Sequence, residues 1–350
     1  MARKQHENIR KILIIRLSSI GDITLTTELV RLVRSKFKDA QIDYLTSKQF
    51  ICLLKHNPNI DNIVSYNKSK SKKKILEERD SYLKESGIEK YDLILDLHNN
   101  FRSRQWTLDI GKSNAIEKFW LEKIAMVYLN QKKKLPTIPI RYLETLNKFD
   151  IESDDKGLEI WLPDEKDYYP PLSKNANGTV KSIGIAPGAH HFTKRWPSSK
   201  FAALISDLIV KYEGAEIHLF GGTDDISISN ELEAIFKSNI KNHVGKLSLI
   251  ESAQEIDKCD LFISNDTGLM HIAAARKVPL VAIFGSTVPA LGFQPYGTQF
   301  QIVENESLPC RPCSHIGRDT CPKKHFNCMN EITPKDVIDG VEGVLQGVNV

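Results

Sequence analysis

The sequence predicts an α/β protein of two domains, each built on a mostly parallel sheet. Three observations support this fold class. The length of 350 residues suits two domains better than one. Apolar runs of strand length alternate with amphipathic helical patterns along the chain. A polar, proline-rich stretch at 150–180 separates two such series, so we expect one domain at 1–170 and another at 171–350.

The first series begins at residues 12–15, a continuous apolar run typical of a parallel strand that is covered on both faces. A helical pattern of apolar residues follows at 23–33. Further strands are expected at 41–45, 63–64 and 92–97. The β-α-β order predicts parallel pairing with right-handed crossovers.

The second series repeats this alternation. Its strands are expected at 182–186, 216–220, 259–264 and 280–284. Its helices are expected at 199–212, from near Asp266 through His271 to Ala275, and at 333–347. The last helix begins at Thr333-Pro334, where threonine caps the helix and proline takes its first position. This helix is the element that could pack back on the first domain.

Composition excludes several classes of protein. With 41% hydrophobic and 26% charged residues, the chain has the composition of a folded globular protein. It contains no apolar run of about 18 residues that could span a membrane, and its N-terminus lacks the apolar core of a signal peptide. We therefore expect a cytoplasmic protein.

Charge is distributed unevenly along the chain. Residues 1–175 hold 32 basic and 25 acidic side chains, a net charge of +7, whereas the remainder holds 16 and 19, a net charge of −3. The basic half predicts an anionic partner. Its lysine run at 68–74 is either a solvated loop or a contact with anionic lipid at the inner face of the inner membrane. No nucleic-acid recognition module is visible.

Small and polar residues follow most strands of the second series. Ligands of open α/β sheets bind beyond the carboxyl ends of the strands, where helix N-termini offer amides to phosphate. This pattern suits a nucleotide-linked ligand. The sequence lacks both Gly-x-Gly-x-x-Gly and a Walker A motif, which argues against the usual dinucleotide and P-loop sites.

Asp22 lies between the first strand and the first helix. One interpretation is a helix cap, which contributes about 1 kcal/mol. The other is a general base, because a carboxylate at a helix N-terminus stays ionised and ready to accept a proton. The local sequence leaves both interpretations open.

Two segments of the second half could bind phosphate. In the basic and aromatic stretch 187–197, Lys194 suits a diphosphate and Arg195 is a second cation, while Trp196 is expected to be structural. In the stretch 265–271, the predicted helix begins near Asp266, and His271 lies one turn inside it. His271 is either a packed core residue or a ligand-binding residue.

Four motifs occur together in one order: Ser-Ile-Gly-Asp ending at Asp22, Lys-Arg-Trp-Pro at 194–197, Asn-Asp-Thr-Gly-Leu-Met-His at 265–271 and Phe-Gly-Ser-Thr at 284–287. As a set they resemble the family-9 glycosyltransferases, the heptosyltransferases of lipopolysaccharide core assembly. The resemblance implies a GT-B fold, in which two Rossmann-like domains face a central cleft. It also implies an inverting enzyme that moves heptose from ADP-heptose to an anionic, lipid-linked inner-core acceptor without a cofactor or bound metal.

The resemblance also assigns roles to residues. Asp22 would be the general base, and Lys194 would hold the diphosphate and stabilise the leaving ADP. The donor-binding residues would be Gly188, Ala189, His190, Lys194, Arg195, Thr223, Leu247, Asp266, Thr267, Gly268 and His271. The acceptor-binding residues would be Ser19, Gly21, His98, Arg102 and Arg141.

A cysteine cluster near the C-terminus comprises Cys310, Cys313, Cys321 and Cys328. Its Cys-x-x-Cys pair and two further thiols could hold a structural zinc ion. The later pair is separated by six residues instead of two, so free or structural thiols are the favoured interpretation.

Two further functions compete with heptose transfer. One is a family-9 relative that uses another nucleotide-sugar for a different surface glycan, because sugar choice depends on the shape of the pocket. The other is a non-catalytic protein that binds sugars or nucleotides on the same scaffold. The joint presence of Asp22 and Lys194 speaks against the non-catalytic alternative.

Overall fold

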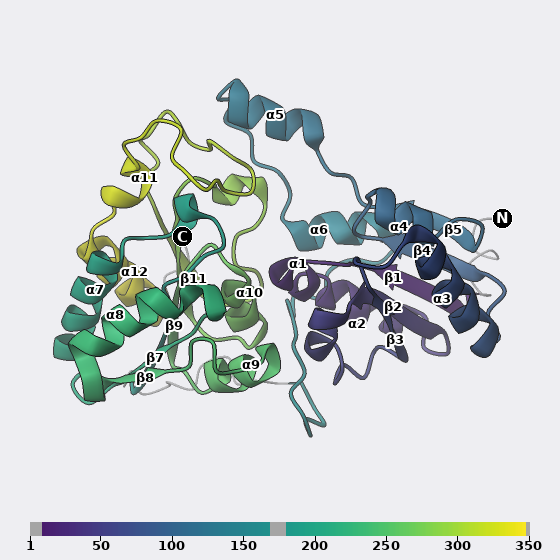
Figure 1. Cartoon of the computed structure of the whole chain (residues 1–350), viewed down its shortest axis with the longest axis horizontal. Coiled ribbons are helices and arrows are strands. Elements are labelled where there is room, and N and C mark those ends of the chain that lie inside the picture. Colours follow the sequence, from purple (N-terminus) through teal and green to yellow (C-terminus); the bar gives the residue numbers. More distant parts are fainter. Residues whose placement is uncertain (1–8, 169–179, 348–350) are drawn as a thin grey trace. The chain divides into compact units, whose positions relative to one another are not determined.

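The computed structural model describes residues 9–168 and 180–347. The chain forms two compact units (Figure 1). Unit 1 comprises Met1–Lys118 and Ile138–Glu165, and unit 2 comprises Phe119–Thr137 and Lys166–Val350. The chain thus enters unit 2 twice, and the boundary expected at 170/171 stays a prediction. No helix among the described residues is long and apolar enough to cross a membrane.

Unit 1 contains a five-stranded parallel sheet in the order β3-β2-β1-β4-β5. Its strands are β1 (Lys11–Ile15), β2 (Gln41–Ser47), β3 (Asn62–Tyr66), β4 (Tyr91–Asp96) and β5 (Gly111–Ala115). The apolar runs expected as strands supply its core, in which Leu13, Ile15, Leu45 and Ile94 pack with Trp106.

The helices of unit 1 are α1 (Ile20–Thr24), α2 (Thr27–Lys36), α3 (Lys72–Glu85), α4 (Phe101–Trp106) and α6 (Ile138–Leu143). The single helix expected at 23–33 is in fact two helices. The hydroxyl groups of Thr24, Thr26 and Thr27 donate to the carbonyls of residues three or four positions earlier. Such hydrogen bonds compete with the helical ladder and bend or end a helix.

Unit 2 contains a six-stranded parallel sheet in the order β11-β10-β9-β6-β7-β8. Its strands are β6 (Ser182–Ala186), β7 (Glu216–Leu219), β8 (Ile240–Asn242), β9 (Leu261–Asn265), β10 (Leu280–Phe284) and β11 (Phe300–Glu304). The predicted α/β class with two parallel sheets is therefore confirmed.

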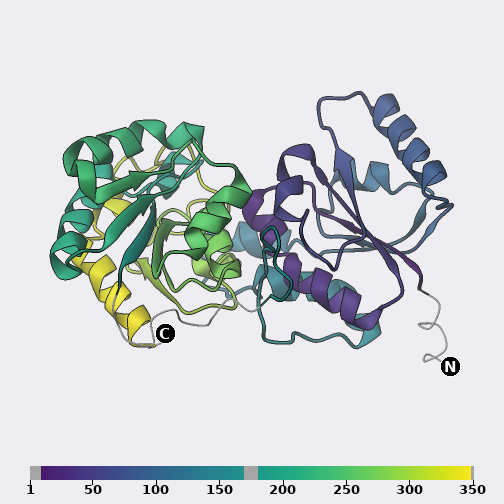
Figure 2. The same ribbon diagram turned by 90° about the horizontal axis from the view of Figure 1, so that it is seen from below.

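The helices of unit 2 are α5 (Trp120–Tyr128), α7 (Ser198–Lys211), α8 (Ile226–Phe236), α9 (Leu249–Asp257), α10 (Gly268–Ala275), α11 (Asn327–Asn330) and α12 (Pro334–Leu345). Figure 2 shows helices against both faces of this sheet. The last helix, α12, packs on α7, β10 and β11 within unit 2, where Val337, Val341 and Val344 join the core.

Each sheet reverses its strand order at one point. In unit 1 the reversal lies between β1 and β4, and in unit 2 it lies between β6 and β9. In open α/β sheets the crevice beyond the carboxyl ends of these two strands is where ligands bind. The loops that follow β1, β4, β6 and β9 are therefore the first places to look for a functional site.

Candidate functional site

The loop after β1 presents Asp22 in the first turn of α1. The Ser19 amide donates to Asp22 Oδ2 at 3.1 Å and the Ser19 hydroxyl donates to the same atom at 2.9 Å. Arg16 Nη2 lies 2.6 Å from Asp22 Oδ1. The same guanidinium donates to the carbonyls of Ser18 and Leu97, so it joins the loops that follow β1 and β4.

These contacts fix the charge of Asp22. Burial by itself would raise the pKa of the carboxyl group, but Arg16 and the hydrogen bonds from Ser19 outweigh burial and hold that pKa below its ordinary value. The side chain keeps 17% of its surface exposed. Asp22 is thus both a helix-capping residue and an ionised, accessible carboxylate, and the two interpretations of the sequence are compatible.

His98 follows β4 on the other side of the reversal point. Asp96 shapes this turn, since Oδ1 accepts the amides of His98 at 3.1 Å and of Asn99 at 2.7 Å. Burial, followed by the charges of Arg16 and Lys118, lowers the pKa of His98 to about 4, so the ring is neutral at pH 7. Within the described part of the chain, His98 Nδ1 is buried without a hydrogen-bond partner.

The structure therefore groups the predicted Ser19, Asp22 and His98 with two residues that the sequence did not single out, Arg16 and Lys118. Arg16 directly follows β1, and its position at a strand end was a usable signal. Lys118 follows β5, a strand that the sequence pattern did not predict. Burial and the charge of Arg16 lower the pKa of Lys118.

The other predicted acceptor residues lie in different surroundings. Arg102 is exposed at the start of α4, and its charge acts on His98. Gly21 is buried in α1. Arg141 is only 1% exposed, and burial lowers the pKa of its guanidinium although Glu144 opposes this effect. A contact between Arg141 and a bound acceptor stays a prediction.

In unit 2, Lys194 and Asp266 form an ion pair. Lys194 Nζ lies 2.6 Å from Asp266 Oδ2, and the Thr287 hydroxyl donates to the same oxygen at 2.7 Å. The sequence predicted Lys194 and Asp266 as separate phosphate-binding residues, but the structure pairs them with each other. An anionic ligand would compete with this carboxylate for the ammonium group.

Hydrogen bonds from side chains to backbone groups and to one another fix the loops after β6, β9 and β10 together. Asn265 Nδ2 donates to the carbonyls of Pro187 at 2.8 Å and Gly188 at 3.3 Å, while its Oδ1 accepts the Trp196 amide at 3.2 Å. The Ser286 hydroxyl donates to Thr193 Oγ1 at 2.9 Å. Lys194 is thus held on a rigid platform at the reversal point between β6 and β9.

Arg195 spans its own loop. Its Nε donates to the Ala189 carbonyl at 2.6 Å and its Nη2 donates to the His190 carbonyl at 3.3 Å. These contacts give Arg195 a role in shaping the loop, and a direct contact with phosphate stays a prediction.

Position 188 accommodates only glycine because the Asp225 side chain lies against it. A Cβ atom at Gly188 would lie 1.9 Å from Asp225 Oδ1, and Asp225 Oδ2 accepts the Gly222 amide at 3.0 Å. Burial raises the pKa of Asp225, although the Gly222 amide and Arg195 oppose this effect. The sequence did not single out Asp225, and the neighbouring Thr223 is exposed.

The remaining predicted donor residues surround the start of α10 and the loop before α9. Thr267 is the N-cap of α10 and Gly268 its first residue. His271 is buried within the same helix. Leu247 is half-buried in the loop before α9. The start of α10 follows the carboxyl end of β9, and the backbone amides at a helix N-terminus favour an anion.

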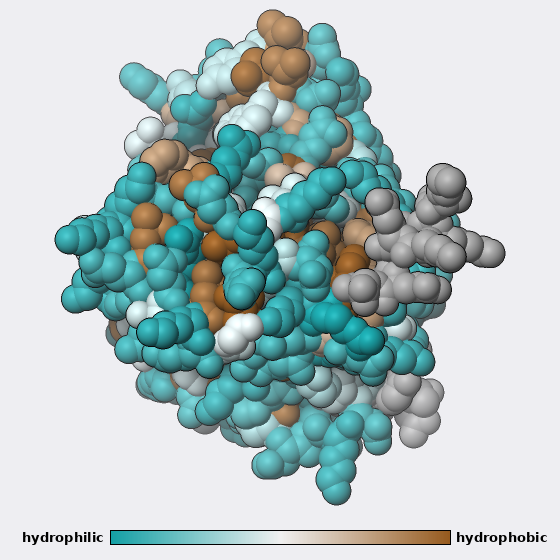
Figure 3. Space-filling model, turned by 90° about the vertical axis from the view of Figure 1, so that its right-hand side faces the viewer, coloured by the Kyte–Doolittle hydropathy of each residue, from teal (hydrophilic) through white to brown (hydrophobic). Residues whose placement is uncertain are grey.

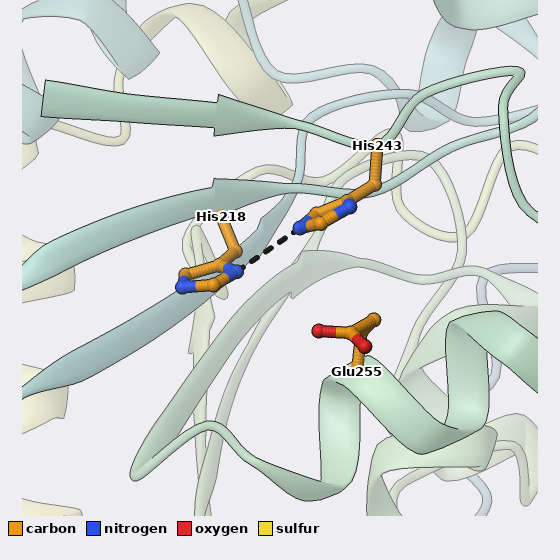
Figure 4. Close-up of side chains that lie close together, drawn as sticks. All are labelled: His218, His243 and Glu255. Atoms are coloured by element: carbon orange, nitrogen blue, oxygen red, sulfur yellow. Dashed lines mark hydrogen bonds between the residues drawn. The ribbon is translucent and has the colours of Figure 1, made fainter. Parts of the chain in front are cut away.

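Two clusters bear on metal binding. Cys310, Cys313, Cys321 and Cys328 form no disulfide, and they are not among the close metal-ligating groups found in the described residues. The one group found there is His218, His243 and Glu255, whose ligand atoms lie within 4.8 Å of one another (Figure 4).

The geometry of the histidine pair favours a hydrogen bond over a chelate. His218 Nδ1 and His243 Nε2 are 3.1 Å apart, and the two nearly coplanar rings have centroids 5.3 Å apart. The distance between the ring centroids exceeds the distance between the two nitrogens by about the width of one imidazole ring. The two nitrogens therefore point at each other. One must carry a proton and the other a lone pair, and the lone pairs do not converge on a shared metal position.

Comparisons with known proteins agree with this architecture. The family model for glycosyltransferase family 9 (heptosyltransferase) matches residues 81–324. The lipooligosaccharide heptosyltransferase 2 of Campylobacter jejuni serotype O:2 is 31% identical over 333 residues, which cover 93% of this chain and 96% of that protein. The lipopolysaccharide heptosyltransferase 2 of Escherichia coli K12 is 27% identical, with 80% of this chain and 84% of that protein covered.

Solved structures show the same fold. The family-9 glycosyl transferase of Veillonella parvula superimposes with a TM-score of 0.76 at 20% identity, over 97% of this chain and 98% of that one. The E. coli ADP-heptose lps heptosyltransferase II superimposes with a TM-score of 0.69 at 23% identity, over 96% and 98% of the two chains. The fold is thus the expected GT-B type.

Proposed function

The chain belongs to glycosyltransferase family 9, the heptosyltransferases, and from this premise we propose that it transfers heptose from ADP-heptose to an inner-core lipopolysaccharide acceptor with inversion at the anomeric carbon. The observation that carries the proposal is the 31% identity to a lipooligosaccharide heptosyltransferase 2 along 93% of the chain. Unit 1 would bind the acceptor and unit 2 the nucleotide-sugar.

Asp22 is the general base of the proposed reaction. The acceptor hydroxyl attacks the anomeric carbon of heptose while its proton passes to the Asp22 carboxylate, and the bond from that carbon to the phosphate oxygen of ADP breaks. A single displacement of this kind inverts the configuration. The lowered pKa of Asp22 supports the role, because the base is ionised in the resting protein and accepts the proton late in the attack.

Lys194 stabilises the leaving ADP in this proposal. Its ammonium group already binds an anion, the Asp266 carboxylate at 2.6 Å, and the β6, β9 and β10 loops hold it in place. Negative charge develops on the diphosphate as the bond breaks, so a fixed cation stabilises the transition state more than the ground state. The other proposed donor contacts are Gly188, Ala189, His190, Arg195, Thr223, Leu247, Asp266, Thr267, Gly268 and His271.

The acceptor binds beside Asp22 in this proposal. Arg16, Lys118 and Arg102 surround His98 with positive charge, which suits an acceptor rich in phosphate and carboxylate groups. The neutral His98 ring offers a nitrogen for a sugar hydroxyl. The proposed acceptor contacts are Ser19, Gly21, His98, Arg102 and Arg141. Because the acceptor is lipid-linked, the enzyme would work at the inner face of the inner membrane.

Thermal unfolding with ADP, UDP, GDP or NAD tests the choice of donor. A ligand at about 100 times its dissociation constant stabilises the native state by roughly 2.7 kcal/mol. Stabilisation by ADP alone, followed by turnover of ADP-heptose with a core acceptor, is the expected result. Stabilisation by UDP or GDP instead would discard heptose as the transferred sugar and favour a different surface glycan.

A further inference from the structure

Helix α5 presents an apolar face to solvent. Leu121, Ile124 and Tyr128 lie on one side of the helix because they are separated by three, four or seven positions. Their exposed fractions are 79%, 48% and 72%, and Leu129 at the end of the helix is 66% exposed. Trp120 at its start is 57% exposed. Contiguous exposed apolar side chains of this kind mark an interaction surface.

The opposite side of α5 anchors the helix to unit 2. Met126 is buried in a small cluster with Leu135 and Leu291, and the Leu135 amide donates to the Ala290 carbonyl at 2.9 Å. Figure 1 shows α5 apart from the strands of unit 2, and Figure 3 shows apolar side chains gathered at the upper end of that view. The exposed face is therefore held in place by the buried one.

Positive charge accompanies this apolar face. Residues 119–137 contain four lysines and one glutamate, a net charge of +3. Lys132, Lys133 and Lys134 are separated from the end of the helix by three residues and are exposed, and they form no ion pair within the described residues. An apolar face with tryptophan, tyrosine and leucine beside a lysine cluster is typical of helices that lie in the interface of an anionic bilayer.

The lysine run at 68–74 lacks these features. Lys70 pairs with Glu78, and Lys73 lies 3.9 Å from Glu77. Acidic residues of α3 thus neutralise part of the charge of this run. The last three lysines of the run form the first turn of α3, and they are exposed to solvent.

We propose that α5 and Lys132–Lys134 form a docking surface for an anionic phospholipid bilayer, in which Leu121, Ile124, Tyr128 and Leu129 enter the acyl boundary and the lysines contact head groups. The inference deepens the proposed function, because it places an enzyme with a lipid-linked acceptor on that lipid's surface. It rests on the surface of unit 2 alone, and binding can be measured without any sugar substrate.

Co-sedimentation with vesicles tests the docking surface. We expect the full chain to sediment with phosphatidylglycerol-containing vesicles and to remain free with pure phosphatidylcholine. Each lysine near an anionic surface contributes about fivefold to the partition coefficient, so Lys132→Ser/Lys133→Ser/Lys134→Ser should reduce binding at least about tenfold. Leu121→Glu/Ile124→Glu should reduce it by at least as much, because both apolar side chains would leave water on docking.

Matched controls use exposed residues elsewhere. Val210 and Ile235 are 83% and 61% exposed on α7 and α8, and Val210→Glu/Ile235→Glu should bind vesicles as the wild type does. Lys72→Ser/Lys73→Ser/Lys74→Ser removes the same charge from α3 and should also leave binding unchanged. Loss of binding in this second triple variant, with binding retained by Lys132→Ser/Lys133→Ser/Lys134→Ser, would overturn the proposal in favour of the other lysine run.

Tryptophan fluorescence gives a second measurement that does not depend on a destabilising variant. Of the four tryptophans, Trp106, Trp161 and Trp196 are buried and Trp120 is exposed. We expect vesicles to shift the emission to shorter wavelength and brominated lipid to quench it, and Trp120→Phe to abolish both effects. Unchanged emission of the wild type with saturating anionic vesicles would overturn the proposal. Neither co-sedimentation nor fluorescence uses the sugar donor or acceptor. Absence of vesicle binding would therefore not contradict heptose transfer, and absence of turnover would not contradict membrane docking.

Discussion

Arg16 Nη2 lies 2.6 Å from Asp22 Oδ1, and the same guanidinium donates to the Leu97 carbonyl at 2.6 Å. One side chain therefore connects the two loops at the strand-order reversal of unit 1 and sets the charge of the carboxylate between them. Because Arg16 opposes the effect of burial on Asp22, the ionisation of the proposed base depends on this pair.

Replacing Asp22 tests the proposed base directly. Asp22→Asn keeps the shape of the side chain and removes its ability to accept the proton, so kcat should fall by about 10²–10⁴-fold, the range for general-base catalysis. Stabilisation by ADP should be retained, because the proposed donor residues belong to unit 2. Steady-state kinetics and thermal unfolding with ADP measure the two effects, and a fully active Asp22→Asn enzyme would exclude Asp22 as the base.

Arg16→Gln should move the acid limb of the pH–rate profile. The pKa of Asp22 is lowered in the native protein, so the base is active above that pKa and lost as pH falls through it. Without the guanidinium, burial dominates and the pKa rises, which moves the loss of kcat/KM to higher pH. Arg31→Gln is the matched control, since Arg31 pairs with Asp154 and Glu159 away from Asp22. An acid limb that stays in place in Arg16→Gln would show that another group titrates.

Lys194→Met should weaken ADP binding by about 10–100-fold, the loss expected for a charge-assisted hydrogen bond of about 1.5–3 kcal/mol. The change also leaves Asp266 without its cation, so a phosphate group would meet an uncompensated carboxylate. Lys211→Met removes the same charge from an exposed pair with Glu342 and should bind ADP normally. Isothermal titration distinguishes the variants, and equal affinities would remove Lys194 from the donor site.

The central strands were predictable, whereas among the four edge strands of the described sheets only β3 was. The runs at 12–15 and 280–284 lie within β1 and β10, whose residues are buried on both faces and read as continuous apolar stretches. The strands β5, β8 and β11 escaped the pattern, and all three lie at sheet edges. An edge strand pairs on one side only and needs fewer apolar residues, as the exposed Gly111–Ala115 segment of β5 illustrates.

The candidate site was predictable residue by residue but not as a set of contacts. Asp22, Lys194 and Asp266 each follow a predicted strand, and that position suffices to nominate them. The pairing of Lys194 with Asp266 depends on β6 lying beside β9, a neighbour relation that strand patterns alone do not fix. Asp225 faces Gly188 for the same reason, since it follows β7 on the other side of β6.

Gly188→Ala should destabilise unit 2 through a clash with Asp225. The new Cβ would lie 1.9 Å from Asp225 Oδ1, and displacing this side chain breaks its bond from the Gly222 amide. We expect a loss of about 1–3 kcal/mol, typical of overpacking. A cycle with Asp225→Ala tests the mechanism, because Gly188→Ala should cost much less in that background. Gly222→Ala is the control, since a Cβ there meets nothing within 4 Å. If the losses of stability in Gly188→Ala and Asp225→Ala simply add in the double variant, the clash is refuted.

The hydrogen-bonded pair of His218 and His243 should make unit 2 less stable in mild acid. Burial, together with nearby positive charge, lowers the pKa of both rings in the native state. In the unfolded chain each histidine binds a proton near its ordinary pKa of about 6.5. The stability that the neutral pair contributes is therefore present above that pH and is lost as pH falls below it. Protonation of both rings would also place two N–H groups face to face across the 3.1 Å contact.

The double variant His218→Asn/His243→Gln isolates this effect, because asparagine and glutamine keep a polar nitrogen or oxygen near each contacting atom and do not titrate. Urea unfolding at pH 7.5 and pH 5.5 should show a smaller acid-induced loss in the variant than in the wild type, by about 1.4 kcal/mol for each unit of lowered pKa removed. His56→Gln, which changes a histidine of unit 1, should lose as much stability as the wild type. If the double variant loses as much as the wild type does, the acid sensitivity lies elsewhere and the pair has no part in it.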